Sequence, residues 1–196
     1  MDLSELLNSP IGQSIVKSVA GQLGINEKEA STAVTTAMPA ILAGMTKNAS
    51  SKEGAESLNK ALESKHDGSL LDNLSSMLQG SVGELQRDGD GILGHVFGGN
   101  RSAIEQGVAR QAGISSGKAG SLLSTLAPIV MAYLGKEKQQ TNAGAGGLGD
   151  LLGNLLGSQQ GKSGGGIMDV LGGALDKDGD GNPLNDLLGG FLGGKR

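Results

Sequence analysis

The sequence predicts an all-α protein that contains two copies of one helical unit. Residues 15–47 recur as a pattern at residues 104–136, always 89 positions later. In both copies apolar residues return every three or four positions, which is the spacing of one face of an α-helix. A repeat of this kind marks a structural unit that needs a neighbour to cover its apolar side. We therefore expect the two copies to pack together.

The first copy reads as two helices joined by a glycine turn. Ahead of it, the spacing of Asp2 and Glu5 fits a capping box, so a short helix is expected before Pro10. An apolar stripe then fills residues 11–23, and Gly24 stands where a helix often ends in the left-handed conformation. The next helix should begin at the Asn26/Glu29 capping pair. Pro39 lacks an amide hydrogen, which predicts a kink or a break there.

The second copy repeats the same order of signals. Residues 104–112 carry an apolar stripe, Gly113 ends it, and Ser115 is placed to cap the following helix. Pro128 falls inside that helix, as Pro39 does in the first copy. A helix, a glycine turn and a proline-containing helix are thus expected twice.

The stretch between the copies predicts further short helices and one turn. Apolar residues at helical spacing indicate one amphipathic helix over residues 55–62 and another over residues 70–78. The sequence Asp-Gly-Asp-Gly at residues 88–91 reads as a turn, and a similar run follows at residues 178–181. The duplication therefore extends toward whole halves of the chain.

The C-terminal quarter is rich in glycine and carries leucine stripes. We predict short amphipathic helices over residues 148–156, 167–175 and 184–192, each too short to be stable alone. They should pack on the core, on one another or on another molecule. The predicted division is residues 1–100 for the first helical module, 101–138 for the second copy, 139–147 for a flexible linker and 148–196 for the glycine- and leucine-rich tail.

Composition narrows the classes of function. The formal net charge is −4 and the pI about 5.2, so nucleic acid is not an expected partner. No cysteine is present, and the acidic N-terminus lacks an apolar stretch of secretory type, which favours the cytoplasm. The longest uncharged stretches contain proline and fall short of a membrane span, so a membrane is not expected either.

Candidate catalytic groups are sparse. His66 and His95 are the only histidines, and neither stands in a pattern typical of a catalytic triad. The Gly161-Lys162-Ser163 run has only the ending of a phosphate loop, because the preceding glycine, Gly157, stands one residue too close and no strand leads into it. We therefore expect no enzyme activity.

One motif fits a metal ion. Carboxylates at the first, third and fifth positions, a glycine at the sixth and a main-chain carbonyl at the seventh are what a calcium loop supplies. The twelfth position is Leu187, where a bidentate acid is expected, so calcium would bind weakly. A plain acidic turn is the alternative, and no other cofactor is expected. The candidate ligands are Asp176, Asp178, Asp180, Asn182 and Asp186.

The glycine turns also resemble those of helix-turn-helix units, in which small residues let two helices cross closely. A recognition helix should present basic or amide side chains to base edges. The helix after Gly24 offers Lys28 beside two glutamates and otherwise mostly alanine, threonine and apolar residues. A DNA-binding regulator is therefore an alternative, but the less favoured one.

Several of these runs together resemble a known family. The Leu-Gly-Ile turn, an Ala-Ser step and a later Pro-Ala-Ile are similar to the YidB-like / domain of unknown function 937 family of bacterial proteins. The resemblance implies an all-helical, homeodomain-like arrangement and brings no established activity. Ala112 in place of Leu23 is a small departure in the second copy. The runs that carry the resemblance are residues 19–25, 30–31, 38–41, 91–99, 108–131 and 176–181.

The sequence as a whole favours a non-catalytic interaction or assembly component. The leucine stripes of the tail would dock in grooves of the same or another subunit, as amphipathic helices do. A protein partner or self-association is therefore expected. The weak calcium-binding protein and the DNA-binding regulator remain as alternatives.

Overall fold

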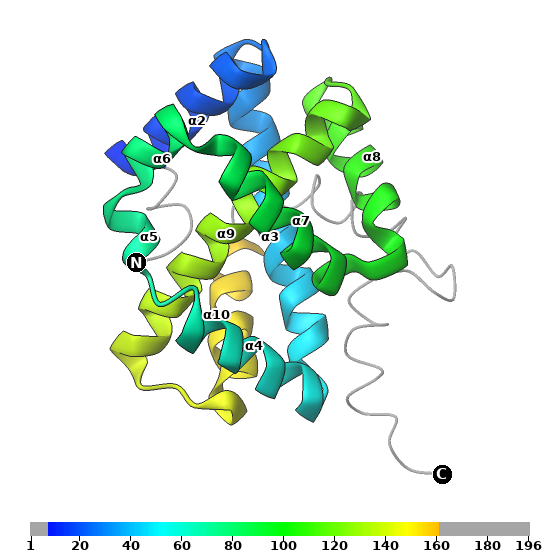
Figure 1. Ribbon diagram of the computed structural model, residues 1–196. Coiled ribbons are helices and arrows are strands. Elements are labelled where there is room, and N and C mark those ends of the chain that lie inside the picture. The colour runs from blue at the N-terminus through cyan, green and yellow to red at the C-terminus, as the bar shows by residue number, and fades with distance from the viewer. Residues whose placement is uncertain (1–7, 161–196) are drawn as a thin grey trace.

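The computed structural model describes residues 8–160, and this part of the chain contains helices and no β-strand (Figure 1). The all-α class is therefore confirmed for the described residues. The helices are α2 (Pro10–Leu23), α3 (Glu27–Ala49), α4 (Lys52–Ser64), α5 (Ser69–Asp72), α6 (Leu74–Gly80), α7 (Val82–Phe97), α8 (Arg101–Ala112), α9 (Ser116–Thr141) and α10 (Leu148–Gln160), with 3-10 turns η1 (Gly98–Asn100) and η2 (Ala145–Gly147). The helix predicted before Pro10 lies largely outside them.

The first glycine turn forms as the sequence predicts. Gly24 ends α2 with φ of 56°, a left-handed conformation that costs glycine little. The side chain of Asn26 accepts a hydrogen bond from the Glu29 amide at 2.9 Å, and the Glu29 carboxylate accepts one from the Asn26 amide at 3.0 Å. This capping box starts α3 and was predicted at these residues.

The second glycine turn has the same local features. Gly113 ends α8 with φ of 70°, and the Ser115 hydroxyl accepts from the Lys118 amide at 3.4 Å to cap α9. The Lys118 ammonium also donates to the carbonyl of Gly24 at 3.2 Å. This bond joins the start of α9 to the end of α2, although 94 residues separate the two partners.

A kink or a break was predicted at each proline. The break does not occur, because neither proline ends its helix. Pro39 lies inside α3 and Pro128 inside α9, and both rings are buried. Each proline leaves the carbonyl four residues earlier without its helical amide. Neighbouring helices surround both positions, and their packing holds each helix together despite the lost bond.

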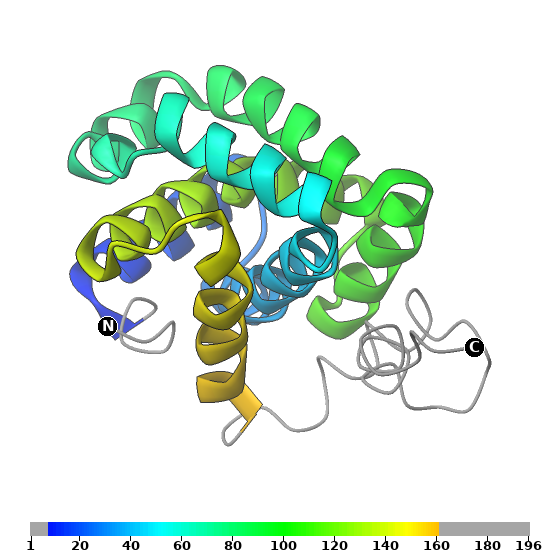
Figure 2. The same ribbon diagram turned by 90° about the horizontal axis from the view of Figure 1, so that it is seen from below.

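The core lies along α3 and α9, the two longest described helices. Residues 36–45 of α3 and 122–135 of α9 are buried without interruption, which means that neighbours cover these helices on every side. Figure 2 shows α4 to α7 as a layer across one side of α3 and α9, while α2, α8 and α10 lie around the remaining sides. Tyr133 of α9, the only tyrosine of the chain, is 3% exposed within this core.

Three local predictions need correction. The Asp-Gly-Asp-Gly sequence at residues 88–91 is not a turn but the middle of α7. Residues 139–141, the first part of the predicted linker, are the last turn of α9. The stripe over residues 70–78 forms two short helices, α5 and α6, which are separated at Asn73. The amphipathic helix predicted over residues 55–62 is confirmed as α4, with Ala55, Leu58 and Leu62 buried.

Candidate functional site

A polar cleft of about 380 Å³ opens between α7, α8 and α9. Its centre is the side chain of Arg101, the first residue of α8, and we call it the Arg101 cleft. It is lined by Gln86, Asp90, Arg101, Glu105, Ser116, Gly117, Gly120, Ser121 and Ser124.

The guanidinium of Arg101 binds one group from each surrounding helix. It donates to the Asp90 carboxylate of α7 at 2.6 Å and to the Glu105 carboxylate of α8 at 2.8 Å. A third bond, at 3.2 Å, goes to the Ser124 hydroxyl of α9. The same hydroxyl donates to Asp90 at 2.6 Å, which closes a ring of three side chains.

The charges in this cleft stabilise one another. The Ser124 hydroxyl and then Arg101 lower the pKa of Asp90, because both donate to its charged form. The Glu105 carboxylate, followed by Asp90, raises the pKa of Arg101. Two carboxylates therefore already neutralise the one cation, and Arg101 has no free charge with which to hold an anionic ligand. The network's evident effect is to tie α7, α8 and α9 together.

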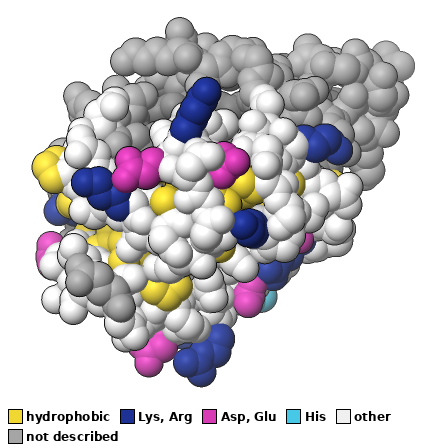
Figure 3. All heavy atoms as spheres, turned by 90° about the horizontal axis from the view of Figure 1, so that it is seen from above, with side chains coloured by type: hydrophobic (Ala, Val, Ile, Leu, Met, Phe, Trp, Pro, Cys, Tyr) yellow, Lys and Arg dark blue, Asp and Glu magenta, His cyan; other side chains and the backbone are white. Residues whose placement is uncertain are grey.

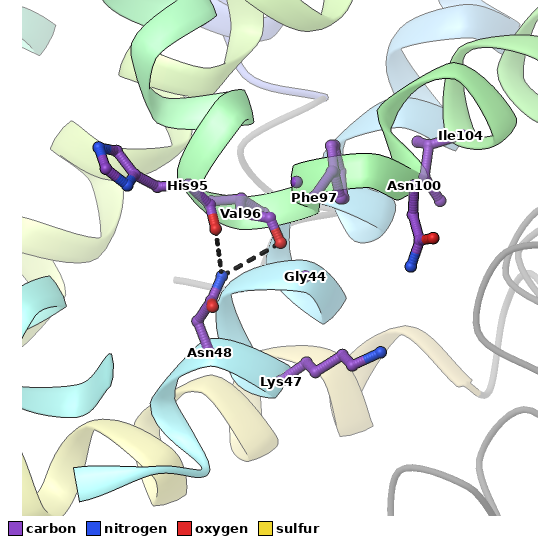
Figure 4. Close-up of a pocket in the computed structure, with 9 residues that line it drawn as sticks. Gly44, Lys47, Asn48, His95, Val96, Phe97, Asn100 and Ile104 are labelled. Carbon is purple, nitrogen blue, oxygen red and sulfur yellow. Dashed lines mark hydrogen bonds between the residues drawn. The ribbon is translucent and has the colours of Figure 1, made fainter. Parts of the chain in front are cut away.

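A second cleft, of about 240 Å³, lies at the C-terminal end of α7 against α3 (Figure 4). The side-chain amide of Asn48 points to the last turn of α7 and donates to the carbonyls of His95 and Val96, each at 3.1 Å. These carbonyls have no partner within their own helix, so Asn48 acts as a side-chain cap. Lys47 extends beside it, where a cation favours the negative end of a helix dipole.

Close packing of α3 on α7 sets the depth of this second cleft. Gly44 of α3 faces Val96 and Phe97, and a Cβ at this glycine would come within 2.5 Å of Val96 and 2.7 Å of Phe97. The glycine therefore lets α7 sit closer to α3 than any other residue would. His95 contributes its backbone carbonyl, and its exposed ring points away from Asn48 (Figure 4).

The predicted metal ligands Asp176, Asp178, Asp180, Asn182 and Asp186 all lie outside the described residues 8–160. The phosphate-loop-like residues 161–163 and the tail segments 167–175 and 184–192 also lie outside. Within residues 8–160, no three histidine, aspartate or glutamate side chains converge in a way that could hold a metal ion. Asp88 and Asp90 do not act together, because Asp88 faces His66 whereas Asp90 binds Arg101.

The position of α3 bears on the DNA-binding alternative. The helix after the first glycine turn, which would be the recognition helix, is buried through residues 36–45. Its exposed side chains are confined to its two ends. On the face shown in Figure 3, basic and acidic side chains are interspersed and no continuous basic patch is seen. This surface lacks the concentration of positive charge that phosphate backbones require.

The leucine stripe predicted over residues 148–156 forms the apolar face of α10, which packs on α3 and α4. Leu148 and Leu152 are fully buried, and Leu155 is 7% exposed. Leu151 and Leu156 are half-buried at the edge of this contact. A short leucine-striped segment of this chain therefore packs on other helices of the same chain.

Sequence reasoning missed the Arg101 network. The pairing of Arg101 with Glu105 could have been read from their spacing, because residues four apart face each other on a helix. Asp90 and Ser124 could not, since Asp90 was assigned to a turn and Ser124 to an apolar helix. Only the crossing of α7 over α9 brings them together.

The described part of the chain thus defines an all-helical protein whose polar clefts are occupied by side-chain networks between helices. No helix in residues 8–160 is long and apolar enough to cross a lipid bilayer. The chain belongs to the family described as "bacterial protein of unknown function (DUF937)", whose model matches residues 5–137. This match confirms the family resemblance. No curated protein and no solved structure matched the chain in the corresponding comparisons.

Proposed function

We propose that the protein works without catalysis, as an interaction or assembly component whose C-terminal segments bind other protein surfaces. The observation that carries this proposal is the docking of α10 on α3 and α4 through Leu148, Leu152 and Leu155. Residues 167–175 and 184–192 repeat the same pattern of apolar residues with an aspartate at the third position. Amphipathic helices of this kind commonly bind in grooves through such stripes. The expected location is the cytoplasm.

The proposal also covers the two helix pairs that follow the internal repeat. We infer that α2–α3 and α8–α9 are two copies of one homeodomain-like unit. Support comes from equivalent positions: Gly24 and Gly113 both have positive φ, and α3 and α9 start at matching residues. Repeated units that pack against each other through their apolar faces fit a scaffold protein. Such packing needs no substrate or other reacting ligand.

The test is the mass of the full-length protein in solution, measured by light scattering. Substituting Leu171→Asp and Leu188→Asp together places a charge in both distal stripes. We expect the wild type to form multiples of the 19.6 kDa chain and the double variant to fall to a single chain. The matched control, Gly172→Asp with Gly189→Asp, adds the same charges beside the stripes and should keep the wild-type mass. Equal masses for all three proteins would refute self-association through the tail.

Calcium binding is the second candidate, because residues 176–182 carry the ligand spacing of a calcium loop. The leucine at the twelfth position predicts weak binding. Titration calorimetry of the full-length protein should then show binding heat that Asp178→Ala removes and Asp72→Ala, a control outside the loop, retains. Identical heats for wild type and Asp178→Ala would exclude this candidate.

A further inference from the structure

His66 occupies a closed site between α4, α7 and α9. Its side chain is 5% exposed, and its Nδ1 atom is buried without a hydrogen-bond partner among the described residues. Its Nε2 atom lies 3.6 Å from the Asp88 carboxylate of α7, which is beyond hydrogen-bond distance. Asp88 is 43% exposed, so water weakens its attraction for a charged ring. The site therefore suits a neutral imidazole.

The loop that carries His66, residues 65–68, is fastened to α9 at three points. The His66 carbonyl lies against Gly135, where any Cβ would collide with it. The carbonyl of Asp67 accepts a hydrogen bond from the Gln139 amide at 2.8 Å. Just before the loop, Glu63 pairs with Lys138 at 2.8 Å. Because the His66 ring is buried at the same place, its position and that of the loop are coupled.

We propose that His66 is a pH-sensitive latch, which holds loop 65–68 against α9 while its ring is neutral and releases the loop when Nδ1 takes up a proton. Protonation turns Nδ1 from an acceptor into an N–H donor and adds a charge. Inside the site this donor has no acceptor and the charge has little solvation, so the protonated ring is stable only outside.

The neighbouring charges do not remove this preference. Lys65 and Asp67, which carry opposite charges, flank the ring in its own loop. Asp88 faces the ring from α7. Lys138 of α9 is already bound to Glu63 of α4. On α9, the Lys136 stem lies near Gly68. Burial lowers the pKa of His66, and this effect outweighs the opposing effect of Asp88.

Opening of the latch should increase as the pH falls. A freely exposed histidine has a pKa of about 6.5 and takes up a proton below it, whereas the closed latch does so only at lower pH. Between the two values the open state binds one more proton than the closed state. The open fraction should therefore rise about tenfold for each pH unit of acidification in that window.

Nuclear magnetic resonance of the full-length protein tests the latch. The ring signals of His66 are followed from pH 7.5 to 5, together with amide hydrogen exchange of residues 65–69 and 135–139. Loop 65–68 should lose protection as the pH falls, with protection taken as the intrinsic exchange rate of the unfolded chain at each pH divided by the observed rate. In His66→Phe, whose ring cannot be charged, the loop should keep its protection at pH 5; His66→Leu serves the same purpose if phenylalanine does not fit.

Two further variants separate the latch from a merely structural histidine. Asp88→Asn removes the one carboxylate on α7 that favours the charged ring, so it should lower the closed-state pKa further and increase opening at pH 5. Gly135→Ala should open the loop at every pH by steric conflict. The latch is refuted if wild type and both His66 variants show the same ratio of loop exchange at pH 7.5 and 5, or if His66 titrates at the pKa of about 6.5 that a freely exposed histidine has.

Discussion

At the scale of single residues, glycines decide how closely the helices approach. Gly89 of α7 faces the backbone carbonyl of Ser124 on α9, and a Cβ at this glycine would overlap that carbonyl. The same carbonyl is the one that Pro128 leaves without its helical amide. Gly89 thus brings its Cα hydrogens to an oxygen that is short of a partner, which is a weak but favourable contact.

Replacement of Gly89 by alanine should therefore destabilise the protein. The added methyl group must push α7 away from α9, and overpacking of this kind typically costs about 1–3 kcal/mol. The matched control is Gly91→Ala in the same helix, where the new methyl group would meet no other atom. Because alanine favours helices over glycine, this control should gain about 0.5–1 kcal/mol. Urea unfolding measures both changes, and equal effects would contradict the proposed close contact.

Asp90 predicts a pH dependence at acid pH. Its pKa is lowered in the folded protein by Ser124 and then by Arg101, so its contribution to stability is present above the unfolded value and lost as the pH falls through the folded value. Since the side chain is half-exposed, the effect should stay below about 1 kcal/mol. Asp90→Asn should flatten the fall of the free energy of unfolding below about pH 4, the pKa of an unfolded aspartate. An unchanged slope in the variant would show that Asp90 contributes nothing there.

At the scale of helices, the clearest sequence signals were those at the ends. The starts of α3 and α9 and the left-handed glycines before them were predicted to the residue, because a cap depends on neighbouring residues only. The amphipathic helix α4 was predicted for a similar reason, since its apolar stripe lies within one short segment.

The caps give a prediction that compares the two modules. Asn26→Ala and Ser115→Ala should each cost about 1 kcal/mol, because each removes the acceptor for an otherwise unpaired amide. Asn26→Ser and Ser115→Asn exchange the two caps and should change the stability much less. Thermal unfolding of the four variants tests this, and a large loss in the exchanged pair would mean that the two helix starts are not equivalent.

The helices that were misassigned depended on contacts far away in the sequence. The Asp-Gly-Asp-Gly run is typical of a turn when local propensity decides, but here Leu85, Leu93 and Phe97 bury one face of α7 against the core and keep the run helical. Likewise, a kink or a break was expected at each proline, and the break does not occur because helix packing on all sides keeps α3 and α9 continuous. Local reasoning could not see these neighbours.

At the scale of the whole molecule, the halves of the chain are interlocked. α3 contacts α8 and α9, and α7 of the first half makes its main contacts with α9 of the second. The sequence could not predict which side chains meet in the Arg101 cleft, because Asp90, Arg101 and Ser124 come from three different helices. The fold class was therefore readable from periodicity, whereas the sites were not.

Interlocking predicts that the described residues unfold as one unit. Leu42 in α3 and Leu123 in α9 are both fully buried, so replacement of either by alanine should cost about 2–5 kcal/mol. Each variant should shift the whole transition measured by circular dichroism, without splitting it. If Leu42→Ala left a separate transition from the second half at its original midpoint, the modules would be independent folding units.

The burial of Tyr133 has a practical consequence for all of these measurements. The chain has no tryptophan and one tyrosine, so its tyrosine fluorescence comes from a single position in α9. That emission is an intrinsic probe of the protein interior and needs no attached dye. A change in it during titration or dilution would therefore report directly whether a loosened loop or a new binding partner disturbs the centre of the molecule.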